Sequence, residues 1–272
     1  MTRVFDLLYH QLNNNPLEAS LNIRDANGDW KSFSTEDVKN YAEQAASGLL
    51  KLGLKPGDKV AMVIYKNRPE WVIMDFALQM SGLISIPLYP TISISEFEYI
   101  LNEVEVKAAF CGGLDLYDKL TLTSKKVPSL ESIYTFDKTD GRPYWKEILD
   151  TDGLAQIEEI KNRSTGEDLI TIIYTSGTTG NPKGVMLTNK NILHAILETT
   201  PFITLHPGER VLSFLPLCHI YERAVSLAWF NKAASIYFCG TDNLSGPNGD
   251  LASVKPVVFT TVPRLLEKVY EA

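Results

Sequence analysis

Short apolar runs rich in β-branched residues alternate with amphipathic segments along most of this chain. Residues 59–65, 83–88 and 107–111 are three such runs, and a segment with helical spacing of apolar residues separates each from the next. This order predicts parallel strands, because a strand reaches a parallel neighbour only through a long crossover connection such as a helix. We therefore expect an α/β fold of mostly parallel sheets flanked by helices.

The first strands are expected to form a hairpin. Two apolar runs, residues 20–24 and 30–33, flank the dipeptide Asn27-Gly28. Asn-Gly favours the backbone twist of a tight β-turn and is a strong signal for a hairpin. Ser34 follows directly and is expected to cap the next helix, because its hydroxyl can accept from the first unbonded backbone N–H groups.

The remaining elements follow from the same periodicities. Asn67 is expected to cap the helix after residue 68, with Glu70 as its partner. Residues 158–168 are polar and are expected to form an exposed lead-in to the strand that follows. Further strands are expected at residues 132–136, 169–174, 185–187, 210–215, 235–238 and 256–261, and helices at residues 34–52, 97–104, 117–125, 192–197, 221–230 and 263–271.

Charge and hydropathy exclude some classes of function. The formal net charge of −7 argues against a nucleic-acid-binding face. Apolar stretches are too short for a membrane-spanning helix, and the first sixteen residues lack the apolar core of a signal peptide. The three cysteines are far apart and contain no C-x-x-C pair, so we expect neither a zinc site nor a disulfide framework. Buried thiols in a reducing, cytoplasmic compartment are the expected state.

The run YTSGTTGNPKG, residues 174–184, carries the strongest chemical signal. Its glycines allow close approach of the backbone to a ligand, and successive N–H groups in such turns bind anions. Lys183 adds a cation. The run is not a Walker A loop, because Pro182 precedes that lysine and Gly184 follows it. A flexible surface loop is the alternative, but the flanking apolar strands favour phosphate binding.

A second run, LPLCHIYER at residues 215–223, places several polar groups after an expected strand. His219 and Glu222 are three residues apart, so they could share one face of a helix. One interpretation is a ligand-binding cluster at the carboxyl edge of the sheet, where α/β proteins bind their ligands. The other is a histidine at the end of a strand beside a structural ion pair.

The first of these runs closely resembles the signature loop T-S-G-T-T-G-x-P-K-G of the adenylate-forming enzymes. In that superfamily the loop holds the β- and γ-phosphates of ATP. The resemblance therefore implies phosphate contacts from Thr175, Ser176, Gly177, Thr178, Thr179, Gly180 and Lys183.

The second run resembles the long-chain acyl-CoA synthetases of the same superfamily. The resemblance implies that His219 lies near the substrate carboxylate and the mouth of the acyl tunnel, with Glu222 and Arg223 bracing it. The run TTVPRLLEK, residues 260–268, is similar to a further family segment that forms one wall of the acyl pocket. On this resemblance Val262 and Pro263 are wall residues.

The resemblance implies a two-step reaction. A fatty acid carboxylate attacks the α-phosphorus of ATP, and coenzyme A then displaces AMP from the acyl-adenylate. Lys183 and His219 are the implied catalytic residues, and Mg²⁺ is an implied cofactor for which no ligand is assigned. The fatty acid is the implied partner. Peripheral membrane association and a homodimer of the full-length form are left open.

Family members are about twice as long as this chain. Their adenine-contacting segment, ribose-binding aspartate, hinge and small C-terminal lid domain have no counterpart here. We therefore expect residues 1–272 to be the N-terminal part of the large AMP-binding domain, with subregions near 1–165 and 166–272, and to be inactive alone. Three alternatives remain open: another acyl- or aryl-adenylating enzyme, a non-catalytic ATP- or acyl-binding module, and a purely structural α/β domain.

Overall fold

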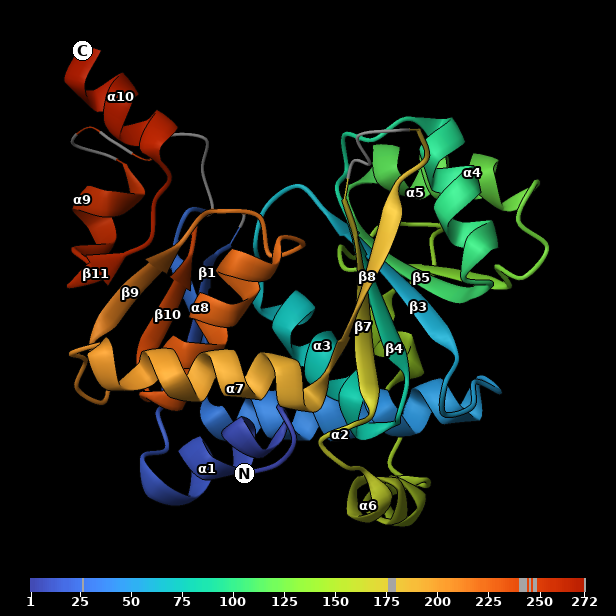
Figure 1. Ribbon diagram of the computed structural model, residues 1–272, viewed down its shortest axis with the longest axis horizontal. Helices are drawn as coiled ribbons and strands as arrows, with labels where there is room; N and C mark the ends of the chain where they lie inside the picture. The colour runs from blue at the N-terminus through green and yellow to red at the C-terminus, as the bar shows by residue number, and fades with distance from the viewer. Residues whose placement is uncertain (26, 176–179, 240–243, 245, 247–248, 272) are drawn as a thin grey trace.

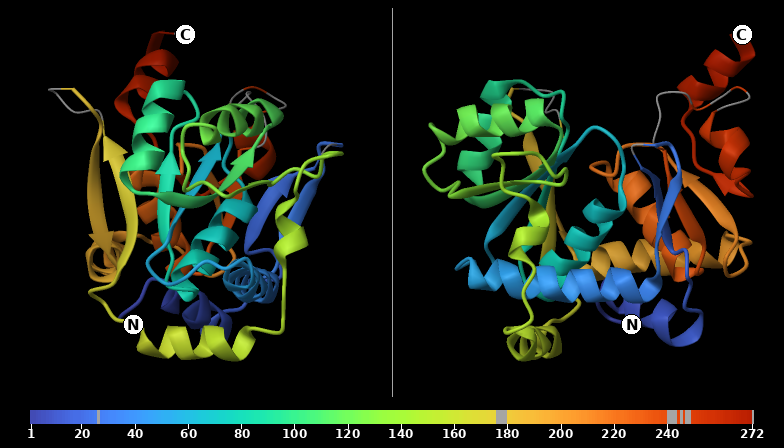
Figure 2. Two further views of the ribbon diagram at one scale, coloured as in Figure 1. Left: turned by 90° about the vertical axis from the view of Figure 1, so that its right-hand side faces the viewer. Right: turned by 180° about the vertical axis from the view of Figure 1, so that it is seen from behind.

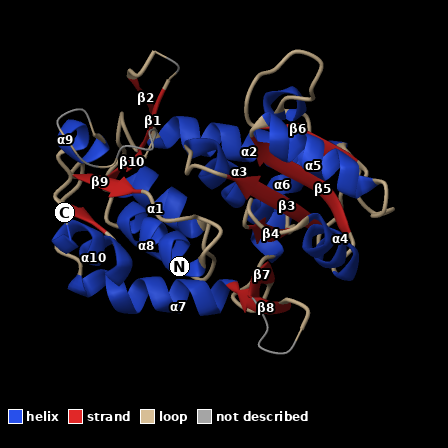
Figure 3. Cartoon of the chain, turned by 90° about the horizontal axis from the view of Figure 1, so that it is seen from above, coloured by secondary structure: helices blue, strands red, loops and turns tan. Residues whose placement is uncertain are grey.

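Two sheets lie side by side with helices packed around them (Figure 1). The computed structural model describes residues 1–25, 27–175, 180–239, 244, 246 and 249–271. Within these ranges one sheet has six strands in the order β6-β5-β3-β4-β7-β8, and the other has five in the order β11-β9-β10-β1-β2. The view from above shows the two sheets as separate groups of strands (Figure 3).

The six-stranded sheet is parallel apart from its last pair. The central strand β3 pairs in parallel with β4 and β5, and β4 pairs in parallel with β7. β7 and β8 are antiparallel, so they form a hairpin at the edge of the sheet. The strands are β3 (Lys59–Ile64), β4 (Ile84–Leu88), β5 (Val106–Gly112), β6 (Ser132–Thr135), β7 (Leu169–Thr175) and β8 (Lys183–Thr188).

The five-stranded sheet combines strands from both ends of the chain. β1 pairs with β2 as the expected antiparallel hairpin, and Gly28 takes the positive φ of 86° that the turn requires. β1 also pairs in parallel with β10, with Leu21 opposite Ile236. The strands are β1 (Leu21–Arg24), β2 (Trp30–Phe33), β9 (Arg210–Ser213), β10 (Ser235–Phe238) and β11 (Val258–Phe259). The expected class of mostly parallel sheets flanked by helices is confirmed.

The boundary expected near residue 165 does not coincide with the division between the sheets. β1 and β2, from the first part of the chain, belong with β9, β10 and β11. β7 and β8 follow residue 165 but extend the sheet built from β3 to β6. The chain therefore crosses between the sheets more than once.

Helices cover the sheets and fill the space between them. α2 begins at a capping box in which Ser34 and Asp37 bond to each other's backbone N–H groups, as expected for Ser34. It runs along one end of the molecule, from below the six-stranded sheet toward the five-stranded sheet (Figure 2). The helices are α1 (Asp6–Asn14), α2 (Thr35–Lys51), α3 (Pro69–Met80), α4 (Ile94–Glu103), α5 (Leu114–Ser124), α6 (Leu154–Arg163), α7 (Asn189–Thr199), α8 (Ile220–Asn231), α9 (Asp250–Val254) and α10 (Pro263–Glu271), with 3₁₀ turns at η1 (Trp145–Ile148) and η2 (Thr200–Phe202).

α3 is the buried link between the two halves of the molecule. Nearly all of its side chains are buried, and Phe76 packs against Phe230 of α8 with ring centroids 5.6 Å apart. Asp75 accepts two hydrogen bonds from Arg223 of α8, at 2.6 and 3.1 Å. No helix in the described ranges is long and apolar enough to cross a membrane.

One sequence expectation was incomplete and another was wrong. Residues 158–168 are exposed at most positions, as expected, but residues 158–163 belong to helix α6, which buries Lys161 against Glu158 and Glu43. Asn67 does not cap α3, whose N-cap is Arg68 and has no side-chain capping bond. The amide of Asn67 instead donates to the hydroxyl of Ser213 and the carbonyl of Leu215, and accepts from the N–H of Leu217. These bonds join the end of β3 to the segment after β9.

Candidate functional site

Two cavities meet at the carboxyl ends of the parallel strands. The first has a volume of about 340 Å³ and lies between α4 and the ends of β4 and β7. The second has a volume of about 470 Å³ and lies between the segment after β9 and the segment after β11. The first is lined by Pro87, Leu88, Tyr89, Ile92, Glu96, Ile100, Ile173, Tyr174, Thr175, Pro182, His219 and Ile220, and the second by Tyr89, Leu215, Pro216, His219, Tyr221, Glu222, Thr261 and Val262.

Tyr89 and His219 line both cavities, so they lie where the two meet. The first cavity reaches the base of the glycine-rich loop through Thr175 and Pro182. The second has mostly apolar walls and includes Val262. This arrangement places the base of the glycine-rich loop, one histidine and an apolar cavity next to one another.

The glycine-rich loop is described at its two ends. Thr175 ends β7 and is paired with Lys183, the first residue of β8. Gly180 has a φ of 131°, a backbone conformation that only glycine adopts readily. Lys183 is exposed beside the cavities and is outside the described lining of both. The predicted contacts of Ser176, Gly177, Thr178 and Thr179 lie outside the described residues.

His219 is the N-cap of α8. Its Nδ1 atom accepts a hydrogen bond of 3.1 Å from the backbone N–H of Tyr221. An accepting Nδ1 carries no proton, so the neutral ring must bear its proton on Nε2. The ring therefore offers an N–H donor at the junction of the cavities. His219 precedes the first helical turn and Glu222 lies within it, and both line the second cavity.

Glu222 is a buried carboxylate in the wall of the second cavity. The hydroxyl groups of Ser213 and Thr260 donate to its two oxygens, at 2.5 and 2.8 Å. Burial raises the pKa of Glu222 to about 7, although both hydroxyl bonds oppose the rise. Glu222 therefore ties the first turn of α8 to the ends of β9 and β11.

Arg223 points away from this cluster and into the molecule, where it forms the bidentate pair with Asp75 of α3. The two residues expected to brace His219 thus hold α8 through different partners. Glu222 fixes the helix to the five-stranded sheet, and Arg223 fixes it to α3.

The structure places one of the two expected wall residues in the lining of the second cavity. Val262 lines the second cavity beside Thr261. Pro263 is exposed, begins α10 and lies outside the described lining of that cavity. The structure thus places Val262 with His219 and leaves Pro263 at the rim.

Sequence reasoning missed Tyr89. No site role was assigned to Tyr89 from the sequence, yet Tyr89 is common to both cavities. A signal was present, because Tyr89 directly follows an apolar strand, and ligand sites in α/β sheets lie beyond the carboxyl ends of the strands. Glu222 was seen as a brace, but its place in the cavity wall was also missed.

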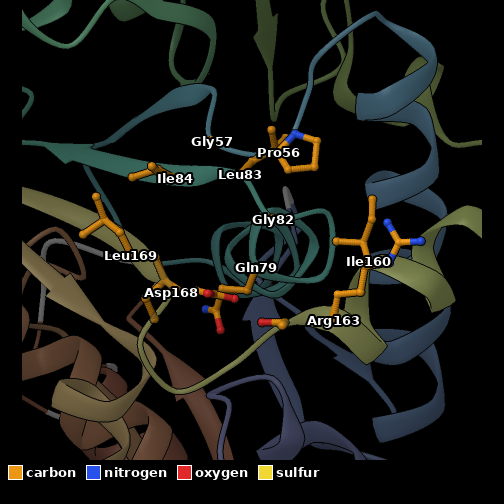
Figure 4. Close-up of a pocket in the computed structure, with 12 residues that line it drawn as sticks. Pro56, Gly57, Gln79, Gly82, Leu83, Ile84, Ile160, Arg163, Asp168 and Leu169 are labelled. Carbon is orange, nitrogen blue, oxygen red and sulfur yellow. The ribbon is translucent and has the colours of Figure 1, made fainter.

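A third cavity, of about 470 Å³, lies at the other end of the strands of the six-stranded sheet. Figure 4 shows residues that line it. Ile84 and Leu169, at the starts of β4 and β7, line it together with Ile160 of α6. It is remote from the glycine-rich loop, which leaves the other end of β7. Across the described ranges, no three His, Cys, Asp or Glu residues form a cluster that could hold a metal ion.

The family model described as AMP-binding enzyme matches residues 8–272. Among curated proteins, the chain is 33% identical to the long-chain-fatty-acid–CoA ligase FadD15 of Mycobacterium bovis over 89% of its own length, and 34% identical to long-chain-fatty-acid–CoA ligase 5 of Rattus norvegicus over 92%. It covers 41% and 39% of those two proteins. The chain thus spans well under half the length of these relatives.

Solved structures share the fold at low sequence identity. A putative long-chain-fatty-acid CoA ligase from Rhodopseudomonas palustris superposes with a TM-score of 0.81 at 20% identity, over 99% of this chain and 65% of that one. The anthranilate CoA ligase AuaEII superposes with a TM-score of 0.78 at 20% identity, over 94% of this chain and 49% of that one. These likenesses establish the fold.

Proposed function

The chain belongs to the family of AMP-binding enzymes, and from this premise we propose that it is part of an enzyme that converts long-chain fatty acids to acyl-CoA with ATP. The observation that carries the proposal is the pair of adjacent cavities that share Tyr89 and His219. The base of the glycine-rich loop lines one cavity, and His219 joins that cavity to an apolar one. This geometry suits a substrate with a carboxylate at one end and a long apolar chain.

In the proposed first step, a carboxylate oxygen attacks the α-phosphorus of ATP. A new P–O bond forms, the bond to the β-phosphate oxygen breaks, and pyrophosphate leaves. The task of the chain is to hold the negative charge that develops on the leaving group. We assign this role to the N–H groups and hydroxyls of residues 175–180 and to the ammonium group of Lys183.

We assign the carboxylate end of the site to His219. Its Nε2–H can donate to a carboxylate or acyl-phosphate oxygen at the junction of the cavities, because its Nδ1 is held by the cap of α8. Val262 and Tyr89 would contact the start of the acyl chain. Pro263 is retained as a rim residue of the same pocket.

The second step would use coenzyme A, whose thiolate attacks the acyl carbon and expels AMP. We propose that residues 1–272 form the N-terminal part of the large AMP-binding domain and are inactive alone, because the chain covers 41% and 39% of the two long-chain-fatty-acid–CoA ligases. Mg²⁺ is an expected cofactor, but we derive no step through it, since the described residues offer no ligand cluster. None of the cysteines forms a disulfide in the described structure, which supports a cytoplasmic location.

A second candidate is the activation of an aryl acid, because the anthranilate CoA ligase AuaEII shares the fold. The two functions are separated by incubating the full-length protein with ATP, coenzyme A and one acid at a time, and measuring thioester formation. We expect a thioester from a C16 fatty acid and none from benzoate or anthranilate. Thioester formation from benzoate or anthranilate, with none from the C16 fatty acid, would contradict the long-chain proposal.

A further inference from the structure

The last turn of α4 is bonded to the outgoing arm of the glycine-rich loop. The hydroxyl of Tyr174, the residue before the loop begins, donates to Oε2 of Glu103. The hydroxyl of Tyr99, one turn earlier on α4, donates to Oε1 of the same carboxylate at 2.8 Å. The carboxylate of Glu103 thus connects the outgoing arm of the loop to α4 and is held from a second side by Tyr99 of its own helix.

Glu103 occupies a position that does not favour a carboxylate. It ends α4, where the helix dipole presents partial negative charge, and no basic residue lies in that turn. Its two tyrosine partners supply the compensating hydrogen bonds. These contacts, rather than helix stability, account for a glutamate at this point.

Gly184 makes room for the ring that Glu103 holds. Gly184 lies opposite Tyr174 in the antiparallel pair of β7 and β8. A Cβ atom at position 184 would lie 2.7 Å from Cγ2 of Ile172 and 3.1 Å from Cζ of Tyr174. The Tyr174 ring therefore packs over the bare backbone of Gly184, and its hydroxyl reaches α4. The last glycine of the loop motif is required here by packing.

We propose that Glu103 is a positioning residue for the glycine-rich loop, holding its outgoing arm through Tyr174 over the space that Gly184 provides, with Tyr99 fixing the carboxylate. The inference rests on the proposed function, because it assigns the loop to the phosphates of ATP. Tyr174 and Thr175 line the first cavity, so a shift of this arm moves the phosphate-binding backbone relative to the cavity. Glu103 itself lies outside the described lining and acts through the tyrosines.

The test uses the full-length protein with Glu103→Ala, and Glu103→Gln as the conservative variant. The control is Glu98→Ala, which removes a half-buried carboxylate of the same helix that pairs with Lys126 instead. Hydrogen exchange is measured for peptides containing Tyr174 and Gly184, and KM is measured separately for ATP and for the fatty acid. We expect faster exchange in those peptides and a KM for ATP raised roughly threefold to tenfold, the effect of losing one or two modest hydrogen bonds. The KM for the fatty acid should be unchanged in Glu103→Ala, and both KM values should be unchanged in the Glu98→Ala control. Glu103→Gln should show a smaller rise in the KM for ATP than Glu103→Ala.

A double-mutant cycle with Tyr174→Phe separates positioning from a general loss of stability. If the two residues act through one bond, the double variant should be little worse than the worse single variant. Unchanged exchange in Glu103→Ala, or equal rises in both KM values, would overturn the inference. If the wild-type protein shows no fatty-acid-dependent activity, the proposed function fails, whereas the exchange measurement needs no activity and still decides the role of Glu103.

Discussion

His219 shows how a backbone contact can set the chemistry of a side chain. The N–H of Tyr221 occupies its Nδ1 atom, so the proton of the neutral ring lies on Nε2. The neutral ring of His219 therefore offers its Nε2–H group as a hydrogen-bond donor.

Glu222 predicts a specific dependence of stability on pH. Its pKa is about 7 in the folded protein, against an ordinary value of 4.5. Below pH 4.5 the carboxyl is protonated in both states. As the pH rises from about 4.5 to about 7, the unfolded chain ionises while the buried carboxyl resists. The stability gained from the protonated form is thereby lost, and the loss is complete above about pH 7.

Glu222→Gln should remove this dependence, because the amide is neutral at every pH. The free energy of unfolding is measured by urea denaturation of both proteins at pH 5 and pH 8. We expect wild type to weaken relative to Glu222→Gln between these pH values, by on the order of 3 kcal/mol at most. The same difference between the two proteins at both pH values would show that Glu222 titrates normally.

Two residues illustrate what the sequence could and could not reveal at this scale. Thr175 and Lys183 were recognised from a motif, and the structure pairs them at the base of the loop. Tyr89 was missed because it belongs to no motif with chemistry of its own. Its place in the site depends on how close the end of β4 lies to the start of α8. Spacing along the sequence does not predict that proximity.

At the scale of elements, α8 is held by two buried groups that face in different directions. Asp75 and Arg223 join it to α3 with side chains that are 3% and 1% exposed. An ion pair this deeply buried has replaced hydration with mutual contacts, so removing one partner leaves an uncompensated charge.

Asp75→Ala should therefore destabilise the protein by about 3–5 kcal/mol. The matched control is Lys126→Ala, which breaks the pair with Glu98, where the lysine side chain is 70% exposed and about 1 kcal/mol or less is expected. Urea denaturation measures both. A loss from Asp75→Ala as small as that of the control would mean that solvent or a new partner reaches Arg223.

Element prediction succeeded where local chemistry decides and failed where distant contacts do. Ser34 caps α2 because the capping box needs only four consecutive residues. Asn67 had the same local signal, but its amide bonds to Ser213, Leu215 and Leu217, about 150 positions away. α6 was missed because its sequence is polar, and its buried Lys161 depends on Glu43 of α2.

At the scale of the whole molecule, the sequence pattern predicted parallel sheets but not their composition. The periodicity of apolar residues identifies a strand but does not show which other strand pairs with it. The pairing of Leu21 with Ile236, and of Ser85 with Thr171, sets which strands share a sheet. These pairings also bring the loop after β7 and the segment after β9 to one side of the molecule. The two cavities that share Tyr89 and His219 lie there.

The account as a whole depends on one claim, that this site forms an acyl-adenylate with release of pyrophosphate. The most direct test is ATP–pyrophosphate exchange by the full-length protein, with and without a long-chain fatty acid, compared with Lys183→Ala. We expect exchange in wild type that requires the fatty acid and slows roughly 100-fold in Lys183→Ala, the typical effect of removing one preorganised stabiliser of developing negative charge. Exchange that is absent, that is independent of the fatty acid, or that is unchanged in Lys183→Ala would contradict this claim.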